Sequence, residues 1–332
     1  MKKTRVAFIL AFLLLLACAP GGGLIPVETA TRSAVPASAT ASLTAVPPTV
    51  TATPRPLAKR VLIVSFDGLR PDAIAAAPMT NVLALMKSGA YTLNAQTIFP
   101  SETLPAHASM LGGMCPSKHG VLWNEYVPEN GYALGVDLFD LAHAAGLRTV
   151  MIVGKEKLRQ VAEPASTDVF DYEEDGEVNI ANAAIEEIGQ GFGVMLVHFP
   201  RGDLKGHEFG WMSKLQLEAY VLGDTELGEL LKALDAKRLR STTLIIVTSD
   251  HGGHKKTHGY DQPEDMTIPW IVSGPGVVPG PLASFVHTTD TAATAADMLG
   301  LPLPAEWDGR PVTEAFGLPI VPRIGEACLR TR

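Results

Sequence analysis

The chain has 332 residues, 46% of them apolar and 19% charged, which suits a large globular domain with a sizeable core. Its formal net charge of −8 argues against a nucleic-acid-binding surface, which depends on clustered Lys and Arg, but it leaves room for a small phosphorylated substrate bound through metal ions. No apolar run reaches the roughly 18 residues of a membrane-spanning helix, so we expect a chain that does not thread the bilayer.

The first residues are typical of a targeting segment. A positively charged start, MKKTR, precedes a short apolar stretch from Val6 to Leu16, and the run LLAC ends it at Cys18. This order resembles a bacterial lipoprotein signal, which implies removal of residues 1–17 and a lipid anchor on Cys18 that holds the protein at the cell membrane. An ordinary secretory signal with an incidental cysteine is the alternative. Both interpretations predict an extracytoplasmic protein.

Residues 18–58 form a second segment of different composition. It is rich in Pro, Ala, Thr and Ser, shows no apolar periodicity and has no charge between Arg32 and Arg55. Such a segment buries too little surface to offset its conformational entropy, so we expect a disordered tether. The composition changes at Lys59, and we expect one catalytic domain over residues 59–332.

Within that domain, short β-rich runs alternate with helical stretches, which predicts an α/β fold with a mostly parallel sheet between two layers of helices. The clearest strands are expected at residues 61–66, 149–153, 194–199 and 244–248, and helices at 79–88, 136–145, 215–234 and 289–299. The strand runs are apolar on both faces, as strands covered on both sides require.

Acidic residues follow three of the expected strands. Asp67 and Asp250 come directly after strands, and Asp203 comes four residues after another. Because ligands of open α/β sheets bind at the carboxyl ends of the strands, these carboxylates are expected to converge at one edge. Their mutual repulsion predicts bound cations.

Histidines accompany these carboxylates at spacings typical of metal ligands. His207 follows Asp203 in GDLKGHEFG, His251 follows Asp250 in SDHGGH, and His258 comes soon after in THGYD. Carboxylate oxygen and imidazole nitrogen are ligands that zinc favours. His254 is the rival to His258, because both lie in the same Gly-rich loop.

Five strings, FDGLRPD, SETLPAHASMLGGMCPSKHG, PRGDLKGHEFG, SDHGGH and THGYD, occur in this order between residues 66 and 261. Their order resembles that of the nucleotide pyrophosphatases/phosphodiesterases of the alkaline phosphatase superfamily. The resemblance implies an alkaline-phosphatase-like α/β/α fold and two zinc ions. The implied ligands are Asp67, Thr103, Asp250 and His251 for one zinc, and Asp203, His207 and His258 for the other. The remaining histidines are interpreted as structural or surface residues.

The resemblance also implies the catalytic residues. Thr103, in SETLPAH, takes the place of the family's nucleophile, although on local grounds it could simply cap the following helix. Zinc would favour its alkoxide, and attack on phosphorus would give a phosphothreonine intermediate. Asn124 lies where the family has an asparagine that contacts a non-bridging phosphoryl oxygen; the alternative is a plain turn residue.

The expected function is therefore hydrolysis of phosphate esters, foremost phosphodiester or nucleotide pyrophosphate bonds. Phosphomonoesterase and phosphonoacetate-type hydrolase activities are the alternatives, and a non-catalytic surface binding protein is a weaker one. The family often has a lysine where this chain has Glu102. An acidic residue there would disfavour extra negative charge, which mildly favours diester over monoester substrates. Lys155 or Lys157 would favour the dianionic phosphate of a monoester if either reached the site, but a solvated loop is preferred for both.

Cys115 and Cys328 remain besides Cys18. An oxidising compartment would permit them to pair, and two free buried thiols are slightly preferred.

Overall fold

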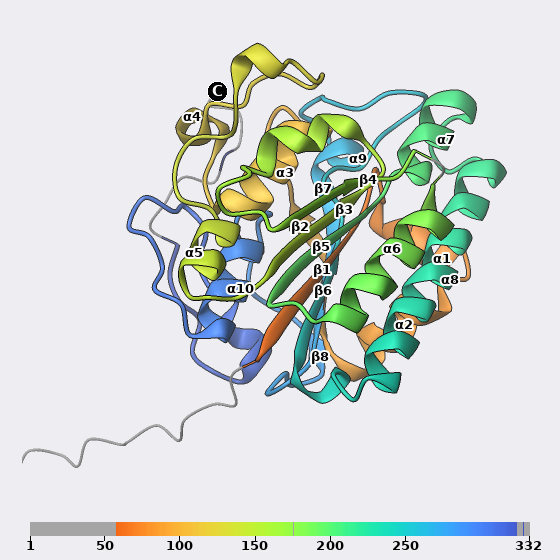
Figure 1. Cartoon of the computed structure of the whole chain (residues 1–332). Helices are drawn as coiled ribbons and strands as arrows, with labels where there is room; N and C mark the ends of the chain where they lie inside the picture. Colours follow the sequence, from red (N-terminus) through yellow and green to blue (C-terminus); the bar gives the residue numbers. More distant parts are fainter. Residues whose placement is uncertain (1–57, 175, 324–327, 329–332) are drawn as a thin grey trace, which may run out of the picture. The chain divides into compact units, whose positions relative to one another are not determined.

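The computed structural model describes residues 58–174, 176–323 and 328. The expected signal segment and, apart from Ala58, the expected tether lie outside the described residues. The described residues fold as an α/β/α sandwich in which one mixed sheet separates two layers of helices (Figure 1).

The sheet of the described residues has eight strands in the order β4-β3-β5-β1-β6-β7-β2-β8. Only β7 runs antiparallel to its neighbours β6 and β2, and the other pairs are parallel. The strands are β1 (Arg60–Phe66), β2 (Ala90–Gln96), β3 (Thr149–Val153), β4 (Val169–Tyr172), β5 (Val194–Phe199), β6 (Thr243–Thr248), β7 (Thr267–Ser273) and β8 (Gly280–Pro281).

Helices cover both faces of the sheet (Figure 1). One layer contains α1 (Pro71–Ala76), α2 (Thr80–Ser88), α6 (Glu177–Gln190) and α8 (Lys214–Ala236); the other contains α3 (Thr103–Gly112), α5 (Leu138–Ala144) and α10 (Asp290–Leu299). The shorter helices are α4 (Pro116–His119), α7 (Arg201–Phe209), α9 (Pro263–Met266), η1 (Pro128–Asn130), η2 (Glu156–Val161), η3 (Arg240–Thr242) and η4 (Thr313–Phe316). Among the described helices, none combines the length and apolarity needed to cross a membrane.

Two hydrophobic cores lie on the two faces of the sheet, and the central strands alternate between them. In β1, Val61 and Ile63 belong to the core under α3, α5 and α10, whereas Leu62, Val64 and Phe66 belong to the core under α2, α6 and α8. Each fully buried side chain of this kind stabilises the fold by about 1.5–3 kcal/mol relative to exposure. Burial on both faces explains why these strands read as continuous apolar runs.

The sequence-based expectation of an α/β fold with a mostly parallel sheet is confirmed. All four expected strands and all four expected helices are present, with ends that differ by up to two residues. The register places the ends of the central strands level, since Phe66 pairs with Phe199 in β5 and Ser65 pairs with Thr248 in β6. The loops that follow β1, β5 and β6 therefore leave the sheet at one edge.

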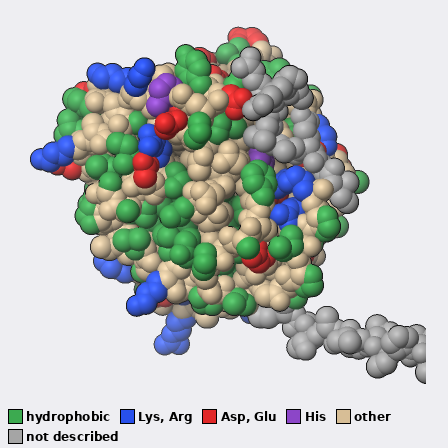
Figure 2. Space-filling model, turned by 180° about the vertical axis from the view of Figure 1, so that it is seen from behind, with side chains coloured by type: hydrophobic (Ala, Val, Ile, Leu, Met, Phe, Trp, Pro, Cys, Tyr) green, Lys and Arg blue, Asp and Glu red, His purple; other side chains and the backbone are tan. Residues whose placement is uncertain are grey.

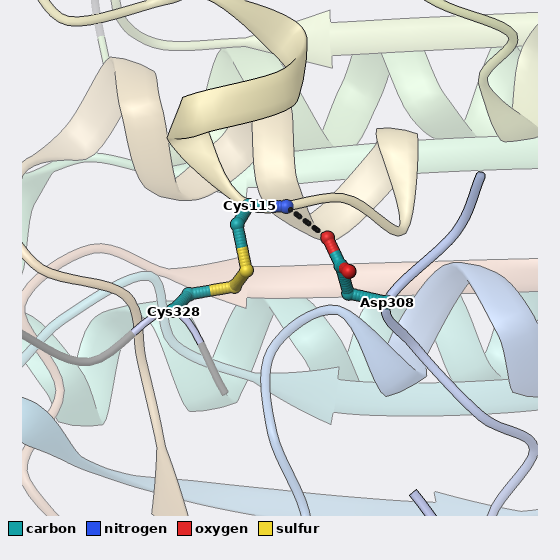
Figure 3. A group of neighbouring side chains, drawn as sticks. All are labelled: Cys115, Asp308 and Cys328. Atoms are coloured by element: carbon teal, nitrogen blue, oxygen red, sulfur yellow. Dashed lines mark hydrogen bonds between the residues drawn. A yellow bond between two sulfur atoms is a disulfide. The ribbon is translucent and has the colours of Figure 1, made fainter. Parts of the chain in front are cut away.

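The preference for two free thiols is wrong. Cys115 and Cys328 form a disulfide across 213 residues of sequence (Figure 3). The Phe99 N–H donates to the Cys328 carbonyl at 3.0 Å, which holds this part of the C-terminal segment against the Phe99 backbone. The Cys115 N–H donates to Asp308 Oδ2 at 2.9 Å beside the bond.

Figure 2 shows the face opposite to that of Figure 1. On its described part, Lys and Arg side chains lie in small separate groups, some at the rim and some inside it, with apolar and acidic side chains between them. This face presents no continuous basic surface in the part of the chain that is described.

Candidate active site

Three buried carboxylates meet at the carboxyl edge of the sheet. Asp67 and Asp250 are fully buried and Asp203 is 2% exposed. The loop after β1 is tied to one of them, since the Gly68 N–H donates to the Asp250 carboxylate at Oδ1, at 3.1 Å. The Lys155 ammonium lies between the other two carboxylates, with Nζ 2.6 Å from Oδ2 of Asp67 and 2.6 Å from Oδ2 of Asp203. Three acidic groups thus face one cation.

Asp203 and His207 lie one turn apart on α7, with His207 Nε2 3.3 Å from Asp203 Oδ1. Asp203, which comes four residues after β5, lies in the first turn of this helix. Gly202 lets α7 pack closely against α8, because a Cβ atom at this position would lie only 2.1 Å from the Tyr220 ring of α8. In the sequence, the spacing of four residues between Asp203 and His207 is typical of two side chains that meet on one face of a helix.

The imidazoles of His207, His251 and His258 are held in the same way. Each Nδ1 lies within hydrogen-bonding distance of a backbone carbonyl, at 3.0 Å from Lys256 O, 2.7 Å from Gly252 O and 2.8 Å from Ser101 O respectively. A carbonyl only accepts, so Nδ1 carries the proton and, in the neutral ring, Nε2 presents a lone pair.

These lone pairs face carboxylate oxygens that have no hydrogen-bond partner. Asp67 Oδ1 lies 3.4 Å from His251 Nε2, and Asp203 Oδ1 lies 3.6 Å from His258 Nε2. Asp250 Oδ2 also lacks a hydrogen-bond partner and lies 3.4 Å from His251 Nε2. Acceptors that face each other at this distance in a buried site repel unless a cation lies between them. The donor set therefore fits metal binding, and two candidate groups share Asp203: Asp203 with His207 and His258, and Asp67 with Asp203 and His251.

The protonation equilibria reflect this excess of negative charge. Burial raises the pKa of Asp250 to about 7, and the negative charge of Asp67 adds to the effect. Burial also opposes ionisation of Asp67, yet Lys155 and the hydrogen bond from His198 hold the pKa of Asp67 well below its usual value. Burial and the neighbouring His251 lower the pKa of His258 to about 3, so its ring is neutral.

The rivalry between His254 and His258 is decided by geometry. The His254 ring bonds Asp265, with Nδ1 2.7 Å from Oδ1, whereas His258 Nε2 lies 3.6 Å from Oδ1 of the site carboxylate Asp203. His258 also stacks on His251 with 3.8 Å between ring centroids.

Thr103 lies at the centre of the site and is 1% exposed. Its Oγ1 is 3.3 Å from His251 Nε2 and accepts from Lys155 Nζ at 3.3 Å. Thr103 is the first residue of α3, and the cap position belongs to Glu102, so the alternative role of Thr103 as helix cap does not apply. The hydroxyl points instead at the carboxylate and imidazole groups.

Asn124 lies beside Thr103. Its Oδ1 accepts from the Leu104 N–H at 3.0 Å and from Lys157 Nζ at 3.0 Å. Because Oδ1 receives these donors, the Nδ2 hydrogens of Asn124 are left to donate to a ligand. The preferred placement of Lys155 and Lys157 in a solvated loop is wrong, since both side chains bond to site residues. Their reach could not be seen in the sequence, because it depends on β3 pairing with β5.

Two further buried histidines, His198 and His107, bond to Asp67 and to the Thr103 backbone. Gly154 N–H donates to His198 Nδ1 at 3.3 Å, so neutral His198 carries its proton on Nε2 and donates to Asp67 Oδ2 at 2.8 Å. His107 Nδ1 lies 2.8 Å from the Thr103 carbonyl. The sequence indicated only structural or surface roles for both, because neither stands in a ligand-like motif.

A third group of possible ligands, Cys115, Asp308 and Cys328, is excluded as a metal site by its own chemistry. Its two sulfur atoms are bonded to each other (Figure 3), and Asp308 instead accepts from Lys118 Nζ at 2.5 Å.

Comparison with known proteins gives one family match and several distant relatives. The family model described as type I phosphodiesterase/nucleotide pyrophosphatase matches residues 61–266. The chain is 24% identical over 221 residues to the human ectonucleotide pyrophosphatase/phosphodiesterase family member 5, covering 60% of this chain and 46% of that protein. It is 23% identical over 234 residues to a bis(5'-adenosyl)-triphosphatase of Xenopus laevis, covering 62% and 48%. The chain thus spans about half the length of these curated relatives.

Solved structures share the fold. Murine ectonucleotide pyrophosphatase/phosphodiesterase 5, inactive and in complex with AMP, aligns with a TM-score of 0.64 and 18% identity over 74% of this chain and 96% of that one. The alkaline phosphatase PafA aligns with a TM-score of 0.64 and 14% identity over 80% of this chain and 100% of that one. The expected alkaline-phosphatase-like architecture is therefore confirmed.

Proposed function

The chain belongs to the type I phosphodiesterase/nucleotide pyrophosphatase family, and from this premise we propose that it hydrolyses phosphate esters with Thr103 as nucleophile at a site for two zinc ions. The proposed ligands are Asp67, Thr103, Asp250 and His251 for one ion, and Asp203, His207 and His258 for the other. Phosphodiesters or nucleotide pyrophosphates, small phosphorylated molecules, are the first candidate substrates.

One observation carries the proposal. The Thr103 hydroxyl lies 3.3 Å from His251 Nε2, at a buried place where unpartnered carboxylate oxygens face imidazole lone pairs. A structural threonine at a helix start has no need of such surroundings. A nucleophile that must lose its proton near neutral pH does need them.

When bound, the zinc ions would supply positive charge that favours the alkoxide and the leaving oxygen. Thr103 Oγ1 forms a bond to phosphorus while the bond to the leaving oxygen breaks, and the hydroxyl proton ends on the leaving group, an alcohol from a phosphodiester or a phosphate from a pyrophosphate. The α3 helix directs its N-terminus toward the phosphoryl group, and Asn124 Nδ2 donates to a non-bridging oxygen. Water then cleaves the phosphothreonine, which regenerates the Thr103 hydroxyl and releases the phosphate product.

Phosphomonoesterase activity is the second candidate, and the two lysines favour it. Lys155 Nζ donates to Thr103 Oγ1 at 3.3 Å, and Lys157 Nζ bonds both oxygens of Asn124 at 3.0 Å. One ammonium group on the nucleophile and a second on Asn124 suit a phosphoryl group with two negative charges better than a diester with one.

The test compares zinc-loaded protein, chelated protein and the Thr103→Ala variant on a nitrophenyl phosphodiester, the matching monoester and a sulfate ester. We expect turnover of a phosphate ester that falls at least about 10³-fold on chelation or on Thr103→Ala. The ratio of diester to monoester kcat/KM decides between the two candidates. A folded, zinc-loaded protein that turns over none of the substrates would be a binding protein.

We further propose an extracytoplasmic lipoprotein anchored to the bacterial cell membrane through Cys18. Its support is the targeting pattern of residues 1–18. If it is correct, a Cys18→Ala variant leaves the membrane fraction, whereas the unchanged protein stays in it.

A further inference from the structure

Gln160 forms an unusually complete set of hydrogen bonds beside the site. It lies in η2 and is 2% exposed. Its Oε1 accepts from Trp123 Nε1 at 3.0 Å and from the Val127 N–H at 2.9 Å. Its Nε2 donates to the carbonyls of Val127 at 2.7 Å and Gly131 at 2.8 Å. All four hydrogen-bonding positions of the amide are therefore used on one segment, residues 123–131.

That segment has little structure of its own. Its regular part is the three-residue η1, and its backbone otherwise depends on bonds from outside. Gln160 bonds the indole of Trp123, the residue directly before Asn124, and the backbone of Val127, three residues after it. Its bonds therefore flank Asn124 on both sides. The Gln160 carbonyl adds a further bond by accepting from the Ala133 N–H at 3.0 Å.

The same short helix also reaches Asn124 directly. Lys157, three residues before Gln160, donates to the Asn124 carbonyl and to Oδ1, each at 3.0 Å. Residues three apart lie on one side of a 3₁₀-helix, so Lys157 and Gln160 face the segment together. Lys157 holds the Asn124 amide in one orientation through Oδ1, and Gln160 holds the chain segment that carries Asn124.

From these contacts we infer that Gln160 is a positioning residue for the reaction, which acts by holding Asn124 Nδ2 toward the phosphoryl oxygen above Thr103. This inference rests on the proposed function. Gln160 touches neither Thr103 nor the proposed metal ligands through any hydrogen bond of its side chain, so its substitution should leave metal content unchanged.

The test is a double-mutant cycle of Gln160→Met with Asn124→Ala, measured as kcat on the best phosphate ester. Asn124→Ala alone is expected to lower kcat about 10²-fold, and Gln160→Met alone at least about 10-fold, because a donor displaced by about 1 Å loses much of its effect. In the Asn124→Ala background, Gln160→Met should change kcat less than about two-fold, since the group it positions is gone.

Two further variants make the result interpretable. Trp123→Phe removes one of the four bonds, keeps the ring and should lower kcat a few-fold, so it takes the place of Gln160→Met if that variant does not fold. Asn81→Leu removes a half-buried amide that bonds Asp224 far along the chain; it should lower stability but leave kcat unchanged.

The outcomes separate this inference from the function that it rests on. A folded Gln160→Met variant with wild-type kcat, or one with the same fold loss in both backgrounds, overturns the positioning role. Loss of bound zinc in Gln160→Met also overturns it, because the effect would then act through the metal ligands. Full activity in Thr103→Ala overturns the proposed function itself.

Discussion

Lys155 is the residue whose position says most about substrate preference. Its ammonium touches two site carboxylates and the nucleophile, and its side chain is only 12% exposed. Burial opposes the charge of Lys155, but the attraction of Asp203 and Asp67 outweighs it and raises the pKa of Lys155, so the ammonium is charged near neutral pH in this structure. A permanent positive charge beside the phosphoryl group discriminates between one and two negative charges on the substrate.

We therefore expect Lys155→Met to lower kcat/KM for a nitrophenyl phosphomonoester about 10²-fold and for the diester less than about 10-fold, because only the monoester gains from the second positive contact. Steady-state kinetics on both esters check this. Equal losses on the two substrates would mean that Lys155 serves the site but does not select the substrate.

His119, which lies outside the proposed ligand set, should make the stability of the fold depend on pH. Burial lowers its pKa from 6.5 to about 4. The ring is neutral in the fold, because Nδ1 accepts from the Val121 N–H at 3.2 Å. Between these pH values the unfolded chain binds a proton that the folded chain does not, so stability falls as the pH is lowered through this window. The loss from this residue is up to about 3 kcal/mol.

Chemical denaturation above pH 6.5 and near pH 4 measures the effect. His119→Gln should show a smaller decrease over this range than the unchanged protein. An identical decrease in both proteins would assign the pH dependence to other groups.

Among the elements, α2 shows how distant parts of the sequence define a helix end. Its cap residue Met79 makes no side-chain cap hydrogen bond, and Asp224 of α8 caps the helix instead. Asp224 accepts from the Asn81 N–H at 3.0 Å and from the Val82 N–H at 2.8 Å. A buried carboxylate at a helix N-terminus accepts hydrogen bonds from the free N–H groups, and its negative charge interacts favourably with the helix dipole.

Asp224→Ala should lower the free energy of unfolding by about 1–2 kcal/mol, since it leaves these N–H groups buried without acceptors. Thermal unfolding checks this, with the exposed Asp235→Ala on the same helix as control. Equal melting temperatures for the two variants would contradict the capping role.

The strands differ in how well the sequence predicts them, and β7 explains why. β1, β5 and β6 are buried on both faces and form continuous apolar runs, so they are readily predicted. β7 contains Pro269, which usually marks an edge strand, yet β7 lies inside the sheet. The register of β2 shifts between Thr92 and Ala95, opposite Pro269, so a bulge accommodates the missing N–H. This compensation lies in another strand and cannot be read locally.

The same distinction applies to the site. The candidate ligands could be proposed from the sequence, because Asp67 and Asp250 directly follow strands and the others stand in short motifs that come soon after a strand. Lys155 and Gln160 were not, because their roles depend on the order of strands in the sheet and on a loop about 30 residues earlier in the chain. Geometry, rather than local sequence, brings Lys155 to Thr103 and Gln160 to Trp123, the residue before Asn124.

At the scale of the whole molecule, the Cys115–Cys328 disulfide links residues near α3 to the end of the chain. Because it closes a loop of 213 residues, it restricts the unfolded chain strongly. Cys115→Ser, Cys328→Ser and the double variant should each lower the free energy of unfolding by about 2–5 kcal/mol, to the same extent, in denaturant titrations. Further loss on adding a reducing agent to the variants would show that the bond is not the cause.

The central claim is that the carboxylate and imidazole groups at one edge of the sheet would hold two metal ions, with Asp250 a ligand of one ion and His258 a ligand of the other. Metal content per chain, measured by mass spectrometry on zinc-loaded and dialysed protein, tests this most directly. The unchanged protein should retain about two zinc ions, and His258→Ala and Asp250→Ala should each retain about one, because each removes a ligand of a different ion. A folded protein that retains no zinc, or the same amount in all three forms, would contradict the claim.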